Sequence, residues 1–263
     1  MQNKIQDARI ERWLQPSDPS RNYNKAMQQR HKGSGIWFLQ HDAFNKWMTH
    51  QNSFLWPYGI PGCGKTILAS TIIEHLERTV PRQSLLYFYF DFSDIHKQTL
   101  EKMIRSFVSQ LSYKHEHIAQ QLHSIFSSCE DGRQQPTIES LCEFLLSSVE
   151  QVSEVWVVID ALDECSTRAG VLAWIRDILA SEGRNVHLLV TSRQEQDIES
   201  SLSEFTCKDD MIPIQNNLTG GDIRAYIHAR IREDEAFKRW GTRPDIQDEI
   251  ETRLSKKADG MLV

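Results

Sequence analysis

The sequence predicts an α/β fold in which helices cover both faces of a mostly parallel sheet. Three observations carry this prediction. Short apolar runs typical of buried strands alternate with longer stretches of helical periodicity, an order that favours a parallel sheet. A glycine-rich segment, GIPGCGKT at 59–66, stands between the first strand and a helix. A later apolar strand, VWVVID at 155–160, ends in an acid. The expected architecture therefore has three layers, helix on sheet on helix.

The chain is expected to begin with polar helices. Residues 1–50 show helical periodicity with scattered aromatic anchors, and a turn-rich segment from Gln15 to Asn24 interrupts them. The first strand is expected at 54–59, where an apolar run suits a buried position. Pro57 lies near the end of this run and cannot donate to a strand ladder, so the sheet is expected to stop early there.

The segment after this strand matches G-x-x-x-x-G-K-[ST], the phosphate-cradling P-loop motif. Its glycines allow the backbone to curl so that several N–H groups face one anion. Lys65 is expected to reach the β- and γ-phosphates of a nucleotide, and the Thr66 hydroxyl to hold Mg²⁺. The following helix adds its positive N-terminal dipole. The predicted nucleotide-binding residues are Gly59, Ile60, Pro61, Gly62, Cys63, Gly64, Lys65 and Thr66.

The remaining strands and helices alternate as the fold requires. Strands are expected at 84–92, 155–160 and 186–192, with a weaker candidate at 211–215. Helices are expected at 66–79, 98–113, 117–128, 137–150, 170–182, 221–232 and 245–258. These elements predict a helical lead-in at 1–50, a P-loop NTPase domain at 51–215 and a truncated helical extension at 216–263.

The strand at 155–160 is expected to supply the acidic half of the site. Ligands of parallel sheets bind at the carboxyl ends of the strands, where Asp160 stands. Asp160 is therefore expected to hold Mg²⁺ opposite Thr66, through water. Asp163 and Glu164 follow in the next loop, and either is expected to orient or deprotonate an attacking water; Asp163 is the residue we favour for this role, with Glu164 as its rival. The alternative for Glu164 is a solvated loop charge.

Two further residues each have two interpretations. Arg193 closes the strand at 186–192 and is expected to sense the γ-phosphate, or else to pair with Asp197 or another nearby acid. Cys63 lies inside the phosphate loop, where a helix N-terminus lowers the pKa of a thiol and favours reaction with electrophiles. A loop-filling role without chemistry is the interpretation we favour for Cys63.

Composition narrows the classes of function. The 263 residues are 40% hydrophobic and 25% charged, as in ordinary globular proteins, and allow one or two domains. The net charge of −6 gives no basic surface for nucleic acid. Five widely spaced cysteines without C-x-x-C favour free thiols in a reducing compartment. With no visible secretory leader and no apolar run of membrane-spanning length, we expect a cytoplasmic protein without a membrane span.

The motifs together resemble the NACHT class of STAND signalling NTPases, and most closely the fungal nephrocystin-like N-terminal type. The resemblance extends from about residue 10 to the C-terminus. It rests on HKGSGIWFL at 31–39, GIPGCGKT at 59–66, VIDALDE at 158–164 and TSR at 191–193. Members of this class normally continue into a helical or winged-helix module and repeats. This sequence stops at Val263 without them, so release of autoinhibition by a repeat sensor is not implied.

The resemblance implies a strand order of 5-1-4-3-2 and a nucleotide-driven switch. It implies that Asp160 supports Mg²⁺, that Asp163 or Glu164 assists hydrolysis, and that Arg193 senses the γ-phosphate. It also implies that residues 31–37 lie near the base.

Two functions from different classes remain open. One is a switch that binds Mg-ATP, or GTP, and hydrolyses it slowly to control assembly with itself or with protein partners of a signalling complex. The other is a scaffold that keeps nucleotide bound without hydrolysing it. A metabolic kinase is disfavoured because residues 96–150 carry few arginines for a lid. ATP is favoured over GTP because no N-K-x-D guanine motif follows the P-loop.

Overall fold

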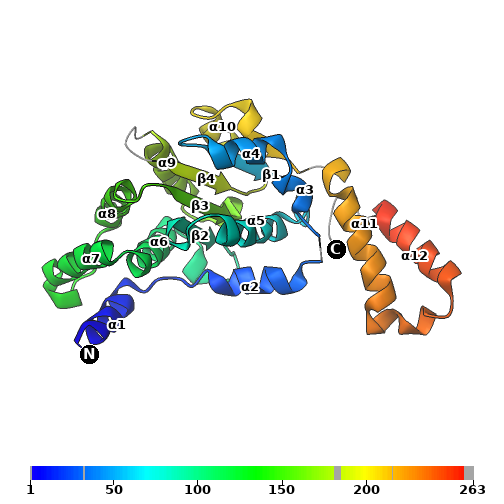
Figure 1. Cartoon of the computed structure of the whole chain (residues 1–263), viewed down its shortest axis with the longest axis horizontal. Helices are drawn as coiled ribbons and strands as arrows, with labels where there is room; N and C mark the ends of the chain where they lie inside the picture. Colours follow the sequence, from blue (N-terminus) through cyan, green and yellow to red (C-terminus); the bar gives the residue numbers. More distant parts are fainter. Residues whose placement is uncertain (1, 32, 181–184, 215, 258–263) are drawn as a thin grey trace.

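The computed structural model describes residues 2–31, 33–180, 185–214 and 216–257. Its strands form a parallel sheet in the order β2-β3-β4-β1-β5 (Figure 1). They are β1 (Phe54–Tyr58), β2 (Leu85–Tyr89), β3 (Val155–Asp160), β4 (Val186–Val190) and β5 (Met211–Pro213). Read from β5, this is the order 5-1-4-3-2. The predicted parallel α/β fold and its strand order are therefore confirmed.

Helices flank the sheet along the whole chain. The lead-in contains α1 (Gln2–Leu14), α2 (Ser20–Gln29), α3 (Ile36–Leu39) and α4 (Asp42–Thr49). The strands are connected by α5 (Lys65–Thr79), α6 (Leu100–Lys114), α7 (Glu116–Ser128), α8 (Ile138–Glu150), α9 (Arg168–Leu179) and α10 (Gln196–Ser203). After β5 come α11 (Asn216–Glu233) and α12 (Pro244–Lys257). Among the residues described, no helix combines the length and apolar character needed to cross a membrane.

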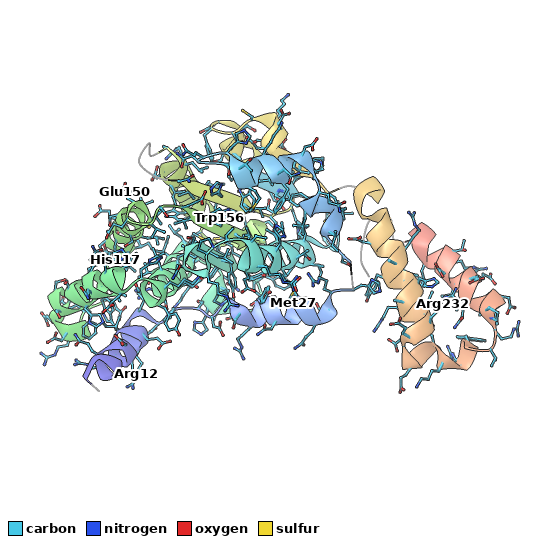
Figure 2. The ribbon with its side chains drawn as sticks, viewed as in Figure 1. Arg12, Met27, His117, Glu150, Trp156 and Arg232 are labelled. Carbon is cyan, nitrogen blue, oxygen red and sulfur yellow. The ribbon has the colours of Figure 1, made fainter. Side chains whose placement is uncertain are left out.

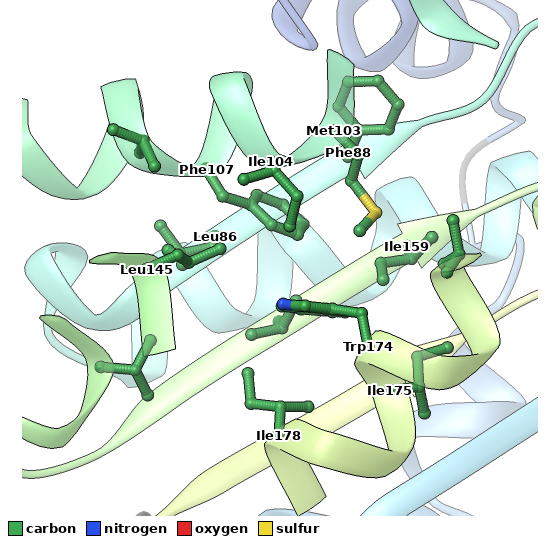
Figure 3. Packing of buried hydrophobic residues seen from close by; sticks show 14 of the residues in the cluster. Leu86, Phe88, Met103, Ile104, Phe107, Leu145, Ile159, Trp174, Ile175 and Ile178 are labelled. Carbon is green, nitrogen blue, oxygen red and sulfur yellow. The ribbon is translucent and has the colours of Figure 1, made fainter. Parts of the chain in front are cut away.

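The interior strand β3 shows why the apolar runs have no polar alternation. Val155, Val157 and Ile159 belong to one buried cluster, together with residues of α6, α8 and α9. Trp156 and Val158 belong to a second cluster on the other face, with residues of α3, α4 and α5. Figure 3 shows the first cluster around Ile159. Since both faces of the sheet are covered, every position of the strand is buried.

The early stop expected at Pro57 is wrong, although the proline does leave a mark. β1 continues to Tyr58 and pairs with β5 at Trp56, Pro57 and Tyr58. Its ladder with β4 pairs Leu55 with Leu189 and resumes only as an isolated bridge at Tyr58. Pro57 has no amide hydrogen, so we attribute the local interruption to it. The strand persists because pairing and burial on its other side hold it.

Several boundaries differ from the predictions for local reasons. The strand predicted at 84–92 ends at Tyr89, and two residues later Asp91 Oδ1 accepts from the Ser93 amide at 2.9 Å, a turn that redirects the chain. The predicted break from Gln15 to Asn24 ends sooner, because α2 begins at Ser20. The helix α10 was not predicted; its apolar anchors, Ile198 and Leu202, are four residues apart in a largely polar segment.

Candidate nucleotide-binding site

The glycine-rich loop joins β1 to α5 at the carboxyl edge of the sheet. Gly62 and Gly64 adopt left-handed backbone angles, with φ of 75° and 92°, which other residues adopt only with strain. Gly59 is required for a different reason, since a Cβ there would lie 2.7 Å from Cys63 Sγ. The loop ends where α5 begins at Lys65, so the first amides of that helix face the same space. The sequence motif thus produces a compact loop at a helix N-terminus.

The side chains of the loop are held by the loop itself. Lys65 Nζ donates to the carbonyl oxygens of Gly59 at 2.8 Å and Ile60 at 2.9 Å, so its ammonium group lies across the loop. Cys63 is buried, and burial raises the pKa of its thiol although the charge of Lys65 acts in the opposite direction. A buried thiol with a raised pKa is a poor nucleophile. The geometry therefore favours the loop-filling interpretation of Cys63.

Asp160, at the end of β3, lies directly beside the loop. Thr66 Oγ1 donates to Asp160 Oδ2 at 2.7 Å, and Thr191 Oγ1 donates to Asp160 Oδ1 at 2.5 Å. The carboxyl group is buried. Burial raises its pKa, and the two threonine hydrogen bonds oppose that shift. The hydroxyl and carboxylate oxygens brought together here are the hard donors that Mg²⁺ prefers, so the residues present fit that cation.

Asp163 and Arg193 form an ion pair beside this cluster. Ala161 has a left-handed φ of 57°, which turns the chain after β3 into the short helical turn Leu162–Glu164. Arg193 Nε lies 3.0 Å from Asp163 Oδ2, and the Arg193 amide donates to Oδ1 at 2.9 Å. The alternative partner named from the sequence, Asp197, pairs instead with Arg168 at 2.9 Å. Two predicted catalytic residues therefore hold each other in place.

Glu164 has a different environment from its neighbour. The Phe92 amide donates to Glu164 Oε2 at 2.9 Å, which connects this acid to the loop after β2. Burial raises the pKa of its carboxyl group, and the nearby charges of Asp163 and Asp160 add to that effect. Both carboxylate oxygens of Asp163 contact Arg193, whereas the Phe92 amide donates only to Oε2 of Glu164. The partial burial of Glu164 and the hydrogen bond from Phe92 argue against the alternative of a solvated loop charge.

These groups open into one cavity of about 670 Å³, a size typical of small-ligand sites. Five predicted loop residues line it, together with both acids of the loop after β3 and with Arg193. The complete lining comprises Pro61, Gly62, Gly64, Lys65, Thr66, Ile67, Ala161, Asp163, Glu164, Arg193, Gln28, Gln29, Arg30, His31, Ser34, Tyr226 and Arg230. Gly59, Ile60, Cys63 and Asp160 are not part of that lining; Cys63 and Asp160 are buried beside it, whereas Ile60 is 49% exposed.

The sequence predicted the cavity residues that come from the phosphate loop, the acidic loop and the end of β4, but not those that come from the end of α2 and from α11. Of the residues 31–37, which are expected near the base, His31 and Ser34 line the cavity and Trp37 lines a smaller adjoining pocket; which part of a nucleotide they face stays a prediction. Arg30, Tyr226 and Arg230 were not expected there. They belong to no motif, and the sole signal was the four-residue spacing of Tyr226 and Arg230 within a predicted helix.

Comparison with known proteins agrees with this geometry. The family model described as nephrocystin 3, N-terminal, matches residues 33–193, a range that runs from the lead-in turn to Arg193. The vegetative incompatibility protein HET-E-1 of Podospora anserina is 27% identical over 208 residues, which cover 76% of this chain. The chain spans only 15% of the length of that relative. These matches confirm the resemblance to fungal nephrocystin-like NACHT domains, and the chain belongs to the nephrocystin 3 N-terminal family.

Proposed function

We propose that this chain is a nucleotide-binding signalling module that binds Mg-ATP and hydrolyses it slowly, with GTP as the alternative nucleotide. The contact between Thr66 and Asp160 carries this proposal. It joins residues 94 positions apart, the last residue of the phosphate loop and the acid at the end of β3. The cavity in front of them is large enough for a nucleotide. A structural glycine turn alone would not require this pair of oxygen donors.

Each group has a role in binding. The amides of the loop and Lys65 would bind the phosphate chain, because they converge at the N-terminus of α5. Thr66 and Asp160 would hold Mg²⁺, which neutralises phosphate charge when it is bound. Asp160 needs its negative charge for this role, and the hydrogen bonds from Thr66 and Thr191 support the charged form.

We assign the activation of water to Glu164 and a positioning role to Asp163. A general base needs a free oxygen within reach of the water and a pKa shifted towards neutrality. The raised pKa of Glu164 fits this requirement. Asp163 instead orients Arg193, whose guanidinium group would face the terminal phosphate.

We further propose that the bound nucleotide controls assembly, either of this chain with itself or with protein partners of a signalling complex. The name of the relative HET-E-1 refers to vegetative incompatibility, and that function is assigned only to that much longer protein. The competing proposal is a scaffold that binds nucleotide and does not hydrolyse it. Light scattering with Mg-ADP and Mg-ATP tests the assembly, since a switch would change its mass between the two nucleotides.

Single-turnover hydrolysis of Mg-ATP separates the switch from the scaffold. We would compare the wild-type chain with Glu164→Gln and Asp163→Asn, and use Glu116→Gln on the exposed start of α7 as a matched control. Loss of a general base slows such reactions by about 10²- to 10⁴-fold. We expect that loss in Glu164→Gln and a smaller one in Asp163→Asn. The reverse order would move the base to Asp163, and bound ATP without turnover in the wild type would establish the scaffold.

A further inference from the structure

One face of α11 meets the candidate nucleotide site. Asp222, Tyr226 and Arg230 follow one another at intervals of four residues, so they share a side of the helix. Tyr226 and Arg230 line the same cavity as Lys65 and Arg193. In Figure 2, α11 lies beyond the end of α2 near Met27, and Arg30 and His31 after α2 line the cavity too. A helix outside the P-loop region therefore forms a wall of the cavity.

Asp222 fixes this face of α11 to the lead-in turn. Its Oδ2 accepts from the Gly35 amide at 2.7 Å, a contact between segments 187 residues apart. Gly35 has a left-handed φ of 80°, and a Cβ there would lie 3.1 Å from Thr71 Oγ1 on α5. The anchor point of α11 is thus a turn packed directly against the helix that begins at the phosphate loop. Burial raises the pKa of the Asp222 carboxyl, and the hydrogen bonds from Gly35 and Trp37 oppose that shift.

The basic residues of the cavity differ in how firmly they are held. Arg30 pairs with Glu74 at 2.7 Å, and both side chains are about one-fifth exposed. Arg193 is fixed by Asp163. Arg230 pairs with Asp234 at 2.7 Å one turn further along α11, and its side chain is 59% exposed. The Arg230 side of this pair is exposed while Asp234 is 23% exposed, so the pair contributes less stability than a buried one, whereas a guanidinium group binds phosphate through two charge-assisted hydrogen bonds. Arg230 can therefore exchange its carboxylate for a phosphate at little cost.

We propose that Arg230 binds the phosphate chain of the nucleotide and thereby makes α11 part of the binding site. This inference rests on the proposed function, that the cavity takes a Mg-nucleotide. One consequence concerns α12. Ile227 and Ile231 of α11 form a small cluster with Ile250 of α12, and Arg232 pairs with Asp248 at 2.9 Å. Nucleotide binding would therefore fix the position of both helices.

The test is a comparison of AMP, ADP and ATP, each titrated with Mg²⁺ into the wild-type chain, Arg230→Ala and Arg232→Ala. Arg232 is the matched control, because it lies on the same helix and pairs with α12 outside the cavity. We expect Arg230→Ala to weaken ATP binding by about 10-fold, ADP less and AMP by under about 2-fold, since a charged hydrogen bond is lost with each phosphate contact. Arg232→Ala should leave all three affinities within about 2-fold.

A second measurement follows the helix itself. Amide hydrogen exchange in residues 222–233 should slow when ATP binds to the wild type and should not slow in Arg230→Ala. Equal losses for AMP, ADP and ATP, or none, would overturn the phosphate contact. If either of these results were found while the wild type bound Mg-ATP and Lys65→Ala did not, only the role of Arg230 would be excluded. A wild-type chain that binds no nucleotide would remove the proposed function and this inference together.

Discussion

The sheet with its helices and the pair α11–α12 are stabilised in different ways. On the sheet, residues of both faces such as Val157, Trp156 and Leu189 lie in extended clusters that are almost completely buried. In α11–α12, the described buried apolar side chains are Ile227 and Ile231. Exposed ion pairs, such as that of Arg232 with Asp248, join the two helices further. Because exposed pairs contribute little to stability, α11–α12 is stabilised much less than the sheet and its helices.

The difference matters because the candidate nucleotide cavity belongs to both regions. The sheet supplies the phosphate loop and the acids, and α11 supplies Tyr226 and Arg230. Weakly packed segments open locally at lower free energy than a core does. A ligand that contacts both would restrain the weaker one. A nucleotide in this cavity is therefore expected to restrain α11 and α12 more than the sheet.

The largest expected effect is on the stability of the core. Ile159→Ala in β3 removes a fully buried side chain, and we expect the free energy of unfolding to fall by about 2–5 kcal/mol. Leu254→Ala on α12 is the control, because Leu254 is 41% exposed and should change little. Chemical denaturation of both variants measures the difference. A loss below about 1 kcal/mol for Ile159→Ala would contradict the account of a tightly packed sheet.

A smaller effect is expected on the binding of Mg²⁺ with ATP. Thr66→Ala removes the hydroxyl that donates to Asp160, and with it a proposed ligand of the cation. We expect Mg²⁺ to improve ATP affinity about 10-fold less in this variant than in the wild type. Thr79→Ala, at the exposed end of α5, is the control. Titrations of ATP with and without Mg²⁺ report the result, and an unchanged response to Mg²⁺ would exclude Thr66 as a ligand.

The core should also carry a contribution to stability that depends on alkaline pH. Lys114 on α6 donates to the Leu85 carbonyl oxygen at the start of β2, and burial lowers its pKa to about 8. The unfolded chain holds that proton up to about pH 10.4, so between these values it binds more protons than the folded chain. Lys114 alone should therefore contribute a gain in stability as pH increases from 8 towards 10, whereas thiols such as that of Cys142, whose pKa burial raises to about 11, act in the opposite direction.

The variant Lys114→Met isolates this contribution. Between pH 8 and pH 10 we expect the free energy of unfolding to change by about 1 kcal/mol less favourably in this variant than in the wild type, because the contribution of Lys114 is lost. This is less than the full shift implies because the side chain is incompletely buried. Lys46→Met, an exposed substitution on α4, should keep the wild-type slope. Unfolding free energies at pH 8, 9 and 10 give the comparison. Identical slopes in all three proteins would mean that Lys114 is solvated in the folded chain.

The smallest expected effect on the free energy of global unfolding comes from a substitution in α11. Ile231→Ala in α11 should lower the free energy of global unfolding by less than about 0.5 kcal/mol, while amides of α11 and α12 exchange faster. Hydrogen exchange separates the local change from the global one. If this variant lost as much global stability as Ile159→Ala, the two regions would unfold as one cooperative unit and the contrast between them would fail.

The parts of the fold that follow from local pattern were predictable from the sequence. The uninterrupted apolar run of β3 indicated burial on both faces, and the P-loop spacing indicated that Thr66 and Asp160 would meet at the sheet edge. In the structure, Thr66 Oγ1 lies 2.7 Å from Asp160 Oδ2. The strand order came from the family resemblance, because local periodicity does not determine which strands are neighbours. Roles in catalysis stay predictions until hydrolysis is measured.

The remaining features depend on tertiary approach, which short patterns do not encode. The pairing of Arg193 with Asp163, and not with Asp197, depends on how the chain turns after β3 at Ala161. The positions of Arg30 and Arg230 in the cavity depend on the packing of α2 against α5 and on the hydrogen bond from Gly35 to Asp222 of α11. The early stop predicted at Pro57 is wrong because a local pattern does not include the pairing with β5, which keeps this residue in the sheet.

Equilibrium binding of Mg-ATP to the wild-type chain and to Lys65→Ala tests the central claim most directly. Lys46→Ala controls for the loss of one positive charge, since Lys46 is exposed and outside the cavity. Our account predicts that Lys65→Ala weakens affinity at least 10- to 100-fold, because a charged group that faces the phosphates is lost, while Lys46→Ala binds like the wild type. Equal affinity in all three proteins would contradict the assignment of 59–66 as the phosphate-binding loop.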